Sequence, residues 1–269
     1  MINYLSAIFL GLVQGATEFL PVSSSGHLLV LHKFFPQLAS NDLAFDTVLH
    51  LATLLALLWF FRQEVIDLVI AWLRSFKGKK DTNSRLAWIT IIGIIPALVV
   101  GYFFADIIDN VFRSTVWVII MLILVGLFFI WFEKIYGNNK KELNSLNWGN
   151  AVVIGLAQIL AFIPGTSRSG ITIIAGLANG LKRESAVKFS FLMSMPLIAA
   201  AGLSQISSLF SGQFAAQEAA TLIIAFIAAT ISGYFTIKYF LLYAANHSLN
   251  IFAYYRFILA AIMTVYFLF

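Results

Sequence analysis

The sequence predicts an all-α integral membrane protein with six transmembrane helices and two re-entrant helix-break-helix hairpins in an inverted repeat. Of its 269 residues, 61% are hydrophobic and 11% are charged, whereas a soluble domain is roughly 45–50% apolar and about 25% charged. Apolar stretches near the length of about 20 residues that a spanning helix needs recur along the chain. Their continuity excludes a transmembrane barrel, whose strands alternate apolar and polar residues. We therefore expect one polytopic membrane domain over residues 1–269.

The first element is an apolar stretch over residues 4–20, which runs into a break from Pro21 to Gly26 and then a shorter apolar piece. A second stretch of this kind, residues 148–163, runs into a break from Pro164 to Gly170. Backbone at such a break is tolerated in a membrane only where protein or a water-filled cavity covers it, so both breaks are expected to line a site. Six runs are long enough to cross the membrane: 43–61, 86–104, 115–135, 185–208, 217–240 and 250–269.

The two hairpins are related by an offset of 144 residues, which aligns residues 11–27 with residues 155–171. We therefore expect a first repeat over about residues 1–143 and a second over about 144–269. Three predicted crossings separate the hairpins, so they should enter from opposite faces and meet near the midplane, where the positive ends of half-helices favour an anion. The aligned identities are Gly11 and Gly155, Leu12 and Leu156, Gln14 and Gln158, Ser23 and Ser167, Ser25 and Ser169, and Gly26 and Gly170.

The basic residues are distributed by membrane side. With both hairpins returning to their own side, thirteen lysines and arginines lie on the face of the connections 62–85, 136–148, 180–188 and 238–249, against two on the other face. Cytoplasmic loops carry such an excess, so both termini and the mouth of the first hairpin are expected outside the cytoplasm. The net charge of +5 then reflects membrane sidedness, and no nucleic-acid partner is expected.

Hydroxyls and glycines at the two breaks predict a phosphate cradle, because backbone N–H groups at a helix start and short hydroxyls donate to oxyanions. Arg168 adds a forked cation that matches phosphate oxygens. The alternative for any single serine is capping of a half-helix. The expected phosphate-binding residues are Ser23, Ser25, Gly26, Ser167, Ser169, Gly170 and Thr172.

Three residues of the first hairpin are candidates for the chemistry. Ser24 is the candidate nucleophile, and His27, three residues later, shares its helix face and could act as general acid or base. Glu18 is an intramembrane carboxylate, which would act as a base or bind a divalent cation together with Gln14, four residues earlier. Structural hydrogen bonds are the alternative for Glu18, Gln14 and His27.

Polar residues farther along the chain are interpreted more simply. Asp46 and His50, four residues apart on the next span, are expected to be interfacial or structural, or to form a secondary polar network. Arg256 and Glu218, near helix ends, are expected to anchor their helices or to form pairs at the membrane interface.

The motifs Gln14-Gly-Ala-Thr-Glu18 with Ser23 to His27, and Pro164-Gly-Thr-Ser-Arg-Ser-Gly-Ile-Thr172, resemble those of the bacitracin-resistance family of undecaprenyl-diphosphate phosphatases. The resemblance extends over essentially the whole chain. It implies a bacterial inner-membrane enzyme that hydrolyses undecaprenyl diphosphate to the monophosphate and inorganic phosphate, and so recycles the lipid carrier of cell-wall synthesis and confers bacitracin resistance.

The same resemblance implies catalytic importance for Glu18, Ser24, His27 and Arg168, a divalent cation such as Mg²⁺ or Ca²⁺, and a site that opens toward the outer face. Many members of that family carry Glu where this chain has Gln14, so Glu18 would share a cation mainly with substrate oxygens. The partners implied are a polyprenyl diphosphate and membrane lipids, and a homodimer is left open.

Two other functions compete with hydrolysis of a lipid diphosphate. Type 2 phosphatidic acid phosphatases need a histidine six residues after the arginine of their Ser-Arg element. Position 174 here is isoleucine, so this family is excluded. A transporter or flippase of a polyprenyl phosphate or another anion is consistent with the inverted repeat alone, and it remains the alternative.

Overall fold

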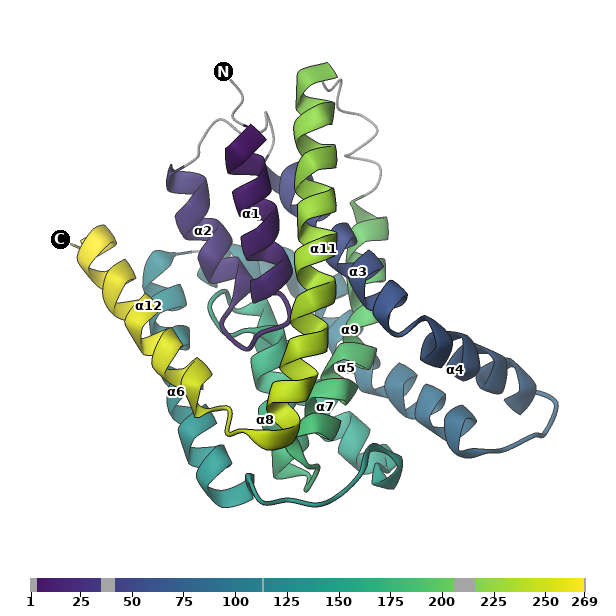
Figure 1. Ribbon diagram of the computed structural model, residues 1–269. Coiled ribbons are helices and arrows are strands. Elements are labelled where there is room, and N and C mark those ends of the chain that lie inside the picture. Colours follow the sequence, from purple (N-terminus) through teal and green to yellow (C-terminus); the bar gives the residue numbers. More distant parts are fainter. Residues whose placement is uncertain (1–3, 35–41, 113, 206–215, 269) are drawn as a thin grey trace.

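The computed structural model describes residues 4–34, 42–112, 114–205 and 216–268 (Figure 1). Within these ranges the chain is helical, with turns between the helices and no β-strand. The first part of the chain forms α1 (Tyr4–Thr17), α2 (Ser24–Phe34), α3 (Asp42–Phe60), α4 (Arg62–Ser75), α5 (Thr82–Phe112) and α6 (Thr115–Tyr136). The second part forms α7 (Trp148–Ile159), α8 (Arg168–Ala178), α9 (Arg183–Ser204), α11 (Ala216–Asn246) and α12 (Asn250–Leu268).

Five helices of the described chain are long and apolar enough to cross a membrane, within α5, α6, α9, α11 and α12. A sixth candidate is the pair α3 and α4, which is bent by 82° near Phe61. All six overlap the predicted spans, so an all-helical structure with five or six candidate membrane-spanning elements is confirmed in the described chain. The predicted hairpins contain only shorter apolar helices, α1 in the first, and α7 and α8 in the second.

Helix α4 was not predicted, since residues 62–85 were assigned to a cytoplasmic connection. Ile66, Val69, Ile70 and Leu73 recur with helical spacing along it, and all four are exposed. On another side of the helix Leu68 is buried, and α4 packs against α5. The charged residues interspersed among these apolar positions conceal the helical period from a search for long apolar runs.

Helices from the first half of the chain pack against helices from the second half, an arrangement called crosswise packing below. Figure 1 shows the α1–α2 hairpin in the upper part of the molecule and α7 and α8 in the lower part. Helix α1 packs against α11 of the other half, and α7 packs against α5. A glycine allows each close approach: Gly11 faces the carbonyl of Ala225, and Gly155 faces the carbonyl of Gly93. Gly11 and Gly155 are aligned in the predicted repeat, and each lies where its helix approaches another helix closely.

Two of the basic connections contact each other at the lower end of the molecule. The Lys141 amide donates to the Gly180 carbonyl at 3.3 Å, and the Lys182 amide donates to the Lys141 carbonyl at 3.0 Å. Lys182 also forms an ion pair with Glu142 at 2.8 Å. These contacts place the connection after α6 beside the connection before α9, as expected for segments on one membrane face.

Candidate functional site

The two breaks have the same local structure. Ser23 and Ser167 have φ angles of 74° and 71°, and in the described chain they are the only residues other than glycine with a positive φ. This conformation is uncommon for a residue with a Cβ. It lets each Oγ accept a hydrogen bond from the amide three residues later, Gly26 at 3.2 Å and Gly170 at 3.1 Å. Capping, the alternative function considered for these serines, is thus observed at both half-helix starts.

The breaks also contact each other. The Ser169 hydroxyl donates to the Leu20 carbonyl at 3.1 Å, and the Gly165 amide donates to the Ser25 hydroxyl at 3.4 Å. The hydroxyls of Ser23 and Ser25 are 3.2 Å apart, as are those of Ser167 and Ser169. Two residues expected to bind phosphate, Ser25 and Ser169, therefore lie where one break meets the other.

The centre of the site is the Glu18 carboxylate, whose two oxygens bind residues of both breaks. Arg168 donates from Nη2 to Oε1 at 2.8 Å, and the Ser24 hydroxyl donates to Oε2 at 2.8 Å. Gln14 donates to the same Oε2 from its amide nitrogen at 3.1 Å. The side chain of Glu18 is 6% exposed and that of Arg168 is 12% exposed. The fold thus brings Gln14, Glu18, Ser24 and Arg168 into one nearly buried cluster.

His27 does not contact Ser24. Its Nδ1 is 2.7 Å from the Ser23 carbonyl oxygen, and its Nε2 is 2.7 Å from the hydroxyl of Tyr255 on α12. The two rings are stacked, with centroids 5.7 Å apart. Both ring nitrogens are therefore engaged, and Glu18 is the group within hydrogen-bond distance of the Ser24 hydroxyl. Tyr255 was missed because an isolated tyrosine in an apolar helix gives no signal in the sequence.

His50 is also part of the site. Its Nδ1 is 3.4 Å from Glu18 Oε2 and 3.3 Å from Gln14 Nε2. Asp46, one helical turn earlier, instead pairs with His32 at 2.8 Å. The purely interfacial or structural role considered for His50 is thus corrected, because α3 brings this imidazole to the central carboxylate.

Arg256 is not an interfacial anchor, as the sequence had indicated, because its side chain is fully buried. The guanidinium donates to the Pro21 carbonyl at 3.3 Å and to the Gly165 carbonyl at 2.9 Å, so it contacts both breaks. It also donates to two carbonyls of α6, Met121 at 2.9 Å and Leu122 at 3.1 Å. Among the described residues, its hydrogen-bond acceptors are neutral carbonyls, so its charge has no carboxylate partner.

Thr172 contacts the backbone of Arg168. Its hydroxyl donates to the Arg168 carbonyl at 2.8 Å and lies 2.7 Å from the hydroxyl of Ser190 on α9. Arg168 Nη1 donates to the Ser190 carbonyl at 3.4 Å. Ser190, which the sequence did not single out, therefore contacts both Arg168 and Thr172.

A divalent cation would find two oxygen donors here. The described residues contain no group of three histidine, cysteine, aspartate or glutamate side chains that could hold a metal ion. Within the same part of the chain, the buried amide oxygen of Gln14 has no hydrogen-bond partner, and it belongs to the residue that contacts Glu18. Such oxygens suit Mg²⁺ or Ca²⁺. Since both cations take at least six ligands, the donors fit a cation only if substrate oxygens and water supply the rest.

Comparison with known proteins gives a consistent result. Residues 7–262 match the family model described as "Bacitracin resistance protein BacA". A protein of Rubrobacter xylanophilus named undecaprenyl-diphosphatase is 42% identical over 268 residues, which cover 98% of each chain. Proteins with the same name from Alteromonas mediterranea and Caldicellulosiruptor bescii are 41% and 40% identical, and the alignments cover at least 95% of each chain.

Proposed function

The chain belongs to the family of bacitracin resistance proteins, and from this premise we infer that it is an undecaprenyl-diphosphatase. It is a multi-pass protein of the bacterial inner membrane and an enzyme that hydrolyses undecaprenyl diphosphate. The products are undecaprenyl phosphate and inorganic phosphate. This reaction regenerates the lipid carrier of cell-wall synthesis, and it accounts for the bacitracin resistance in the family's name.

One observation supports the assignment of the chemistry to the paired breaks. Glu18 accepts a hydrogen bond from Ser24 of the first break and from Arg168 of the second, both at 2.8 Å. The candidate nucleophile and a phosphate-binding cation thus both contact Glu18, which is the candidate base. This arrangement suits phosphoryl transfer to a serine.

We propose that the Ser24 oxygen attacks the terminal phosphorus while its proton passes to Glu18. The bond from that phosphorus to the bridging oxygen breaks, and undecaprenyl phosphate leaves. Water then attacks the phosphoserine, the bond from phosphorus to the Ser24 oxygen breaks, and inorganic phosphate leaves with the protons of the water while Glu18 returns its proton to Ser24. In the alternative, Glu18 activates water directly and Ser24 only binds the substrate; a phosphoserine trapped by rapid acid quenching would distinguish the two.

Arg168 is the proposed ligand of the diphosphate oxygens. Its guanidinium already lies at the start of α8, where the partial positive charge of a helix N-terminus favours an anion. Phosphate oxygens would replace part of its contact with Glu18, which frees the carboxylate to accept a proton. His27 is our candidate for protonating the leaving oxygen, for which its Nε2 would exchange the Tyr255 hydroxyl for that oxygen.

A divalent cation, Mg²⁺ or Ca²⁺, is proposed to enter with the substrate, held by Glu18 and the amide oxygen of Gln14. When bound, it would neutralise negative charge on the phosphates. Because the chain supplies only two of these oxygens, we expect cation affinity to be weak without substrate and stronger with it.

The site is proposed to open toward the outer face of the membrane, with both termini outside the cytoplasm. Support comes from the basic residues of the connections after α6 and before α9, which lie together at one end of the molecule. Cytoplasmic loops are the ones that carry such an excess of lysine and arginine.

The test is phosphate release from undecaprenyl diphosphate by the purified protein in detergent, with and without a chelator. We expect turnover by the native protein and loss of turnover in Ser24→Ala and in Arg168→Ala, with both variants still folded. Turnover that survives both substitutions would move the active site elsewhere. A folded native protein that binds the lipid but releases no phosphate, even with Mg²⁺ or Ca²⁺, would instead favour transport of the lipid phosphate.

A further inference from the structure

An apolar groove borders the first break. It is a cavity of about 660 Å³ between α1, α2, the end of α11 and the start of α12. We propose that this groove holds the isoprenoid tail of the lipid diphosphate, an inference that rests on the function proposed above. The residues of its walls include Phe9, Val13, Thr17, His27, Ile251 and Tyr255.

Two polar residues of the groove are sequence neighbours of the reacting groups. Thr17 immediately precedes Glu18, and His27 lies one helical turn after Ser24. His27 Nε2 and the Tyr255 hydroxyl, from two residues that both line the groove, are 2.7 Å apart. A tail in the groove would therefore start beside the proposed diphosphate site. The apolar cavity between α3, α4, α5 and α9 is lined by no residue of either break, so it lacks this connection.

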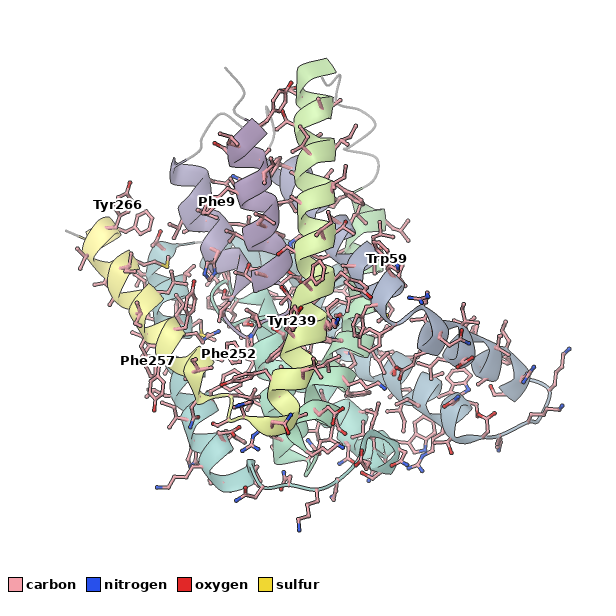
Figure 2. The ribbon with its side chains drawn as sticks, in the orientation of Figure 1. Phe9, Trp59, Tyr239, Phe252, Phe257 and Tyr266 are labelled. Carbon is pink, nitrogen blue, oxygen red and sulfur yellow. The ribbon has the colours of Figure 1, made fainter. Side chains whose placement is uncertain are left out.

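The groove continues into a second cavity, of about 520 Å³, along α11. Leu20, Tyr243 and Phe252 line both, so the apolar surface is continuous across them. Figure 2 shows Phe9 near the upper end of α1, Phe252 near the start of α12 and Tyr239 on α11. Tyr239 lines the second cavity and is 59% exposed, and Phe9 in the first is 48% exposed.

Exposed aromatic and aliphatic walls suit a ligand that stays in the bilayer. A polyprenyl tail in the groove would extend sideways into lipid past the exposed Phe9 and Tyr239. Lipid tails are as apolar as the groove, so the tail gains little from leaving lipid and is held by shape and van der Waals contact. Filling the groove should therefore act by steric exclusion and should affect the tail and not the headgroup.

The test compares one substitution at two places. Val13→Trp fills the groove, while Val69→Trp places the same side chain in the unconnected cavity beside α4. We expect Val13→Trp to raise the KM for undecaprenyl diphosphate about tenfold, the lower end of what a changed apolar pocket contact does to substrate discrimination. Val69→Trp should behave as the native enzyme. The inhibition constant of inorganic pyrophosphate, a headgroup without a tail, should be unchanged in both variants.

Ile251→Trp on the opposite wall serves as a second groove variant if Val13→Trp does not fold, as judged by gel filtration. An unchanged KM in the folded groove variants, equal losses in Val69→Trp, or a parallel shift of the pyrophosphate constant would overturn the proposal. If the native protein releases no phosphate, the proposed hydrolysis is wrong. The groove is then judged by binding, with undecaprenyl phosphate retained by Val69→Trp and lost by Val13→Trp in native mass spectrometry.

Discussion

The Glu18 carboxylate is the residue on which the site most depends. It is nearly buried, and one of its partners is a charged guanidinium that would be left without its carboxylate if Glu18 were neutral. Removing one member of a buried ion pair commonly costs about 3–5 kcal/mol, because the other charge stays buried and unpaired. A loss of activity on mutation could therefore reflect unfolding, so the prediction needs a comparable pair elsewhere in the fold.

Glu133 and Arg183 provide that pair, at 2.6 Å and with the Glu133 side chain 3% exposed. We expect Glu18→Gln to lower turnover at least about 100-fold, the contribution of a general base. Both substitutions should lower the melting temperature by similar amounts. Glu133→Gln should nevertheless keep native turnover per folded molecule. Phosphate release normalised to the folded fraction, measured by gel filtration with fluorescence detection, distinguishes the two. Equal turnover losses would show that Glu18 acts only through stability.

Arg256 is the residue that the sequence pattern misjudged, and it supports its own prediction. Its hydrogen bonds to the carbonyls of Pro21 and Gly165 come from different nitrogens of one planar fork. A lysine keeps the charge but offers a single ammonium, so it cannot reproduce this geometry. We expect Arg256→Lys to reduce kcat about tenfold or more, by loosening the breaks that position Ser24 and Arg168.

The control for this prediction is Arg183→Lys, a substitution at a largely buried arginine away from the breaks. It should leave kcat near the native value. Native kcat in Arg256→Lys would show that the four carbonyl contacts are dispensable for catalysis. A proportional loss of kcat in both variants would point to general destabilisation of the fold.

Much of the site was predictable at this scale, for a physical reason. Charged side chains are conspicuous in apolar sequence, so Glu18 and Arg168 could be selected by residue type, whereas Ser24 was selected among three adjacent serines because it aligns with Arg168. The partners of these residues come from distant helices. Tyr255 and Ser190 were not singled out, and His50 was assigned at most to a secondary polar network, because only the packing of α12, α9 and α3 brings these residues to the breaks.

At the scale of elements, the spans were predictable because membrane thickness fixes their length and composition. Helix α4 was not, because amphipathic segments of mixed charge do not stand out in a search for long apolar runs. The half-helix starts were located by their Pro, Ser and Gly residues. Their shared backbone, with Ser23 and Ser167 at positive φ, could not be predicted, because serine seldom adopts that conformation.

The close contact of α1 with α11 gives an element-scale prediction. Replacing glycine with alanine in a helix is normally stabilising by about 1 kcal/mol. At Gly11 the added Cβ would collide with the Ala225 carbonyl, so we expect Gly11→Ala to destabilise the protein by roughly 1–3 kcal/mol. At Gly149 the added Cβ would meet only Asn147 Oδ1, at 3.3 Å. Gly149→Ala should therefore have a much smaller effect.

Thermal melting in detergent measures both glycine variants. A melting temperature for Gly11→Ala at or above that of the native protein would mean that α1 and α11 separate enough to admit a methyl group. The crossed packing described here would then be looser than the contact geometry indicates.

For the whole molecule, the orientation in the membrane is directly measurable because the chain contains no cysteine. Ser114 and Asn138 are exposed and lie just beyond the two ends of α6. With Ser114→Cys and Asn138→Cys as separate variants, a membrane-impermeant maleimide added to intact cells should label position 114 only. Labelling of position 138 should require permeabilisation. The reverse pattern would invert the proposed orientation and turn the mouth of the site toward the cytoplasm.

The crosswise packing of the two halves has a consequence for biosynthesis. Helix α1 ends at Thr17, whereas its partner α11 begins at Ala216, which at about 5–20 residues per second separates the two by roughly 10–40 s of translation. During that interval the half-helix that carries Gln14 can pack against α2 and α3, but it lacks the long helix α11. The second break and α12 are also made late, so the complete active site is among the last features to form.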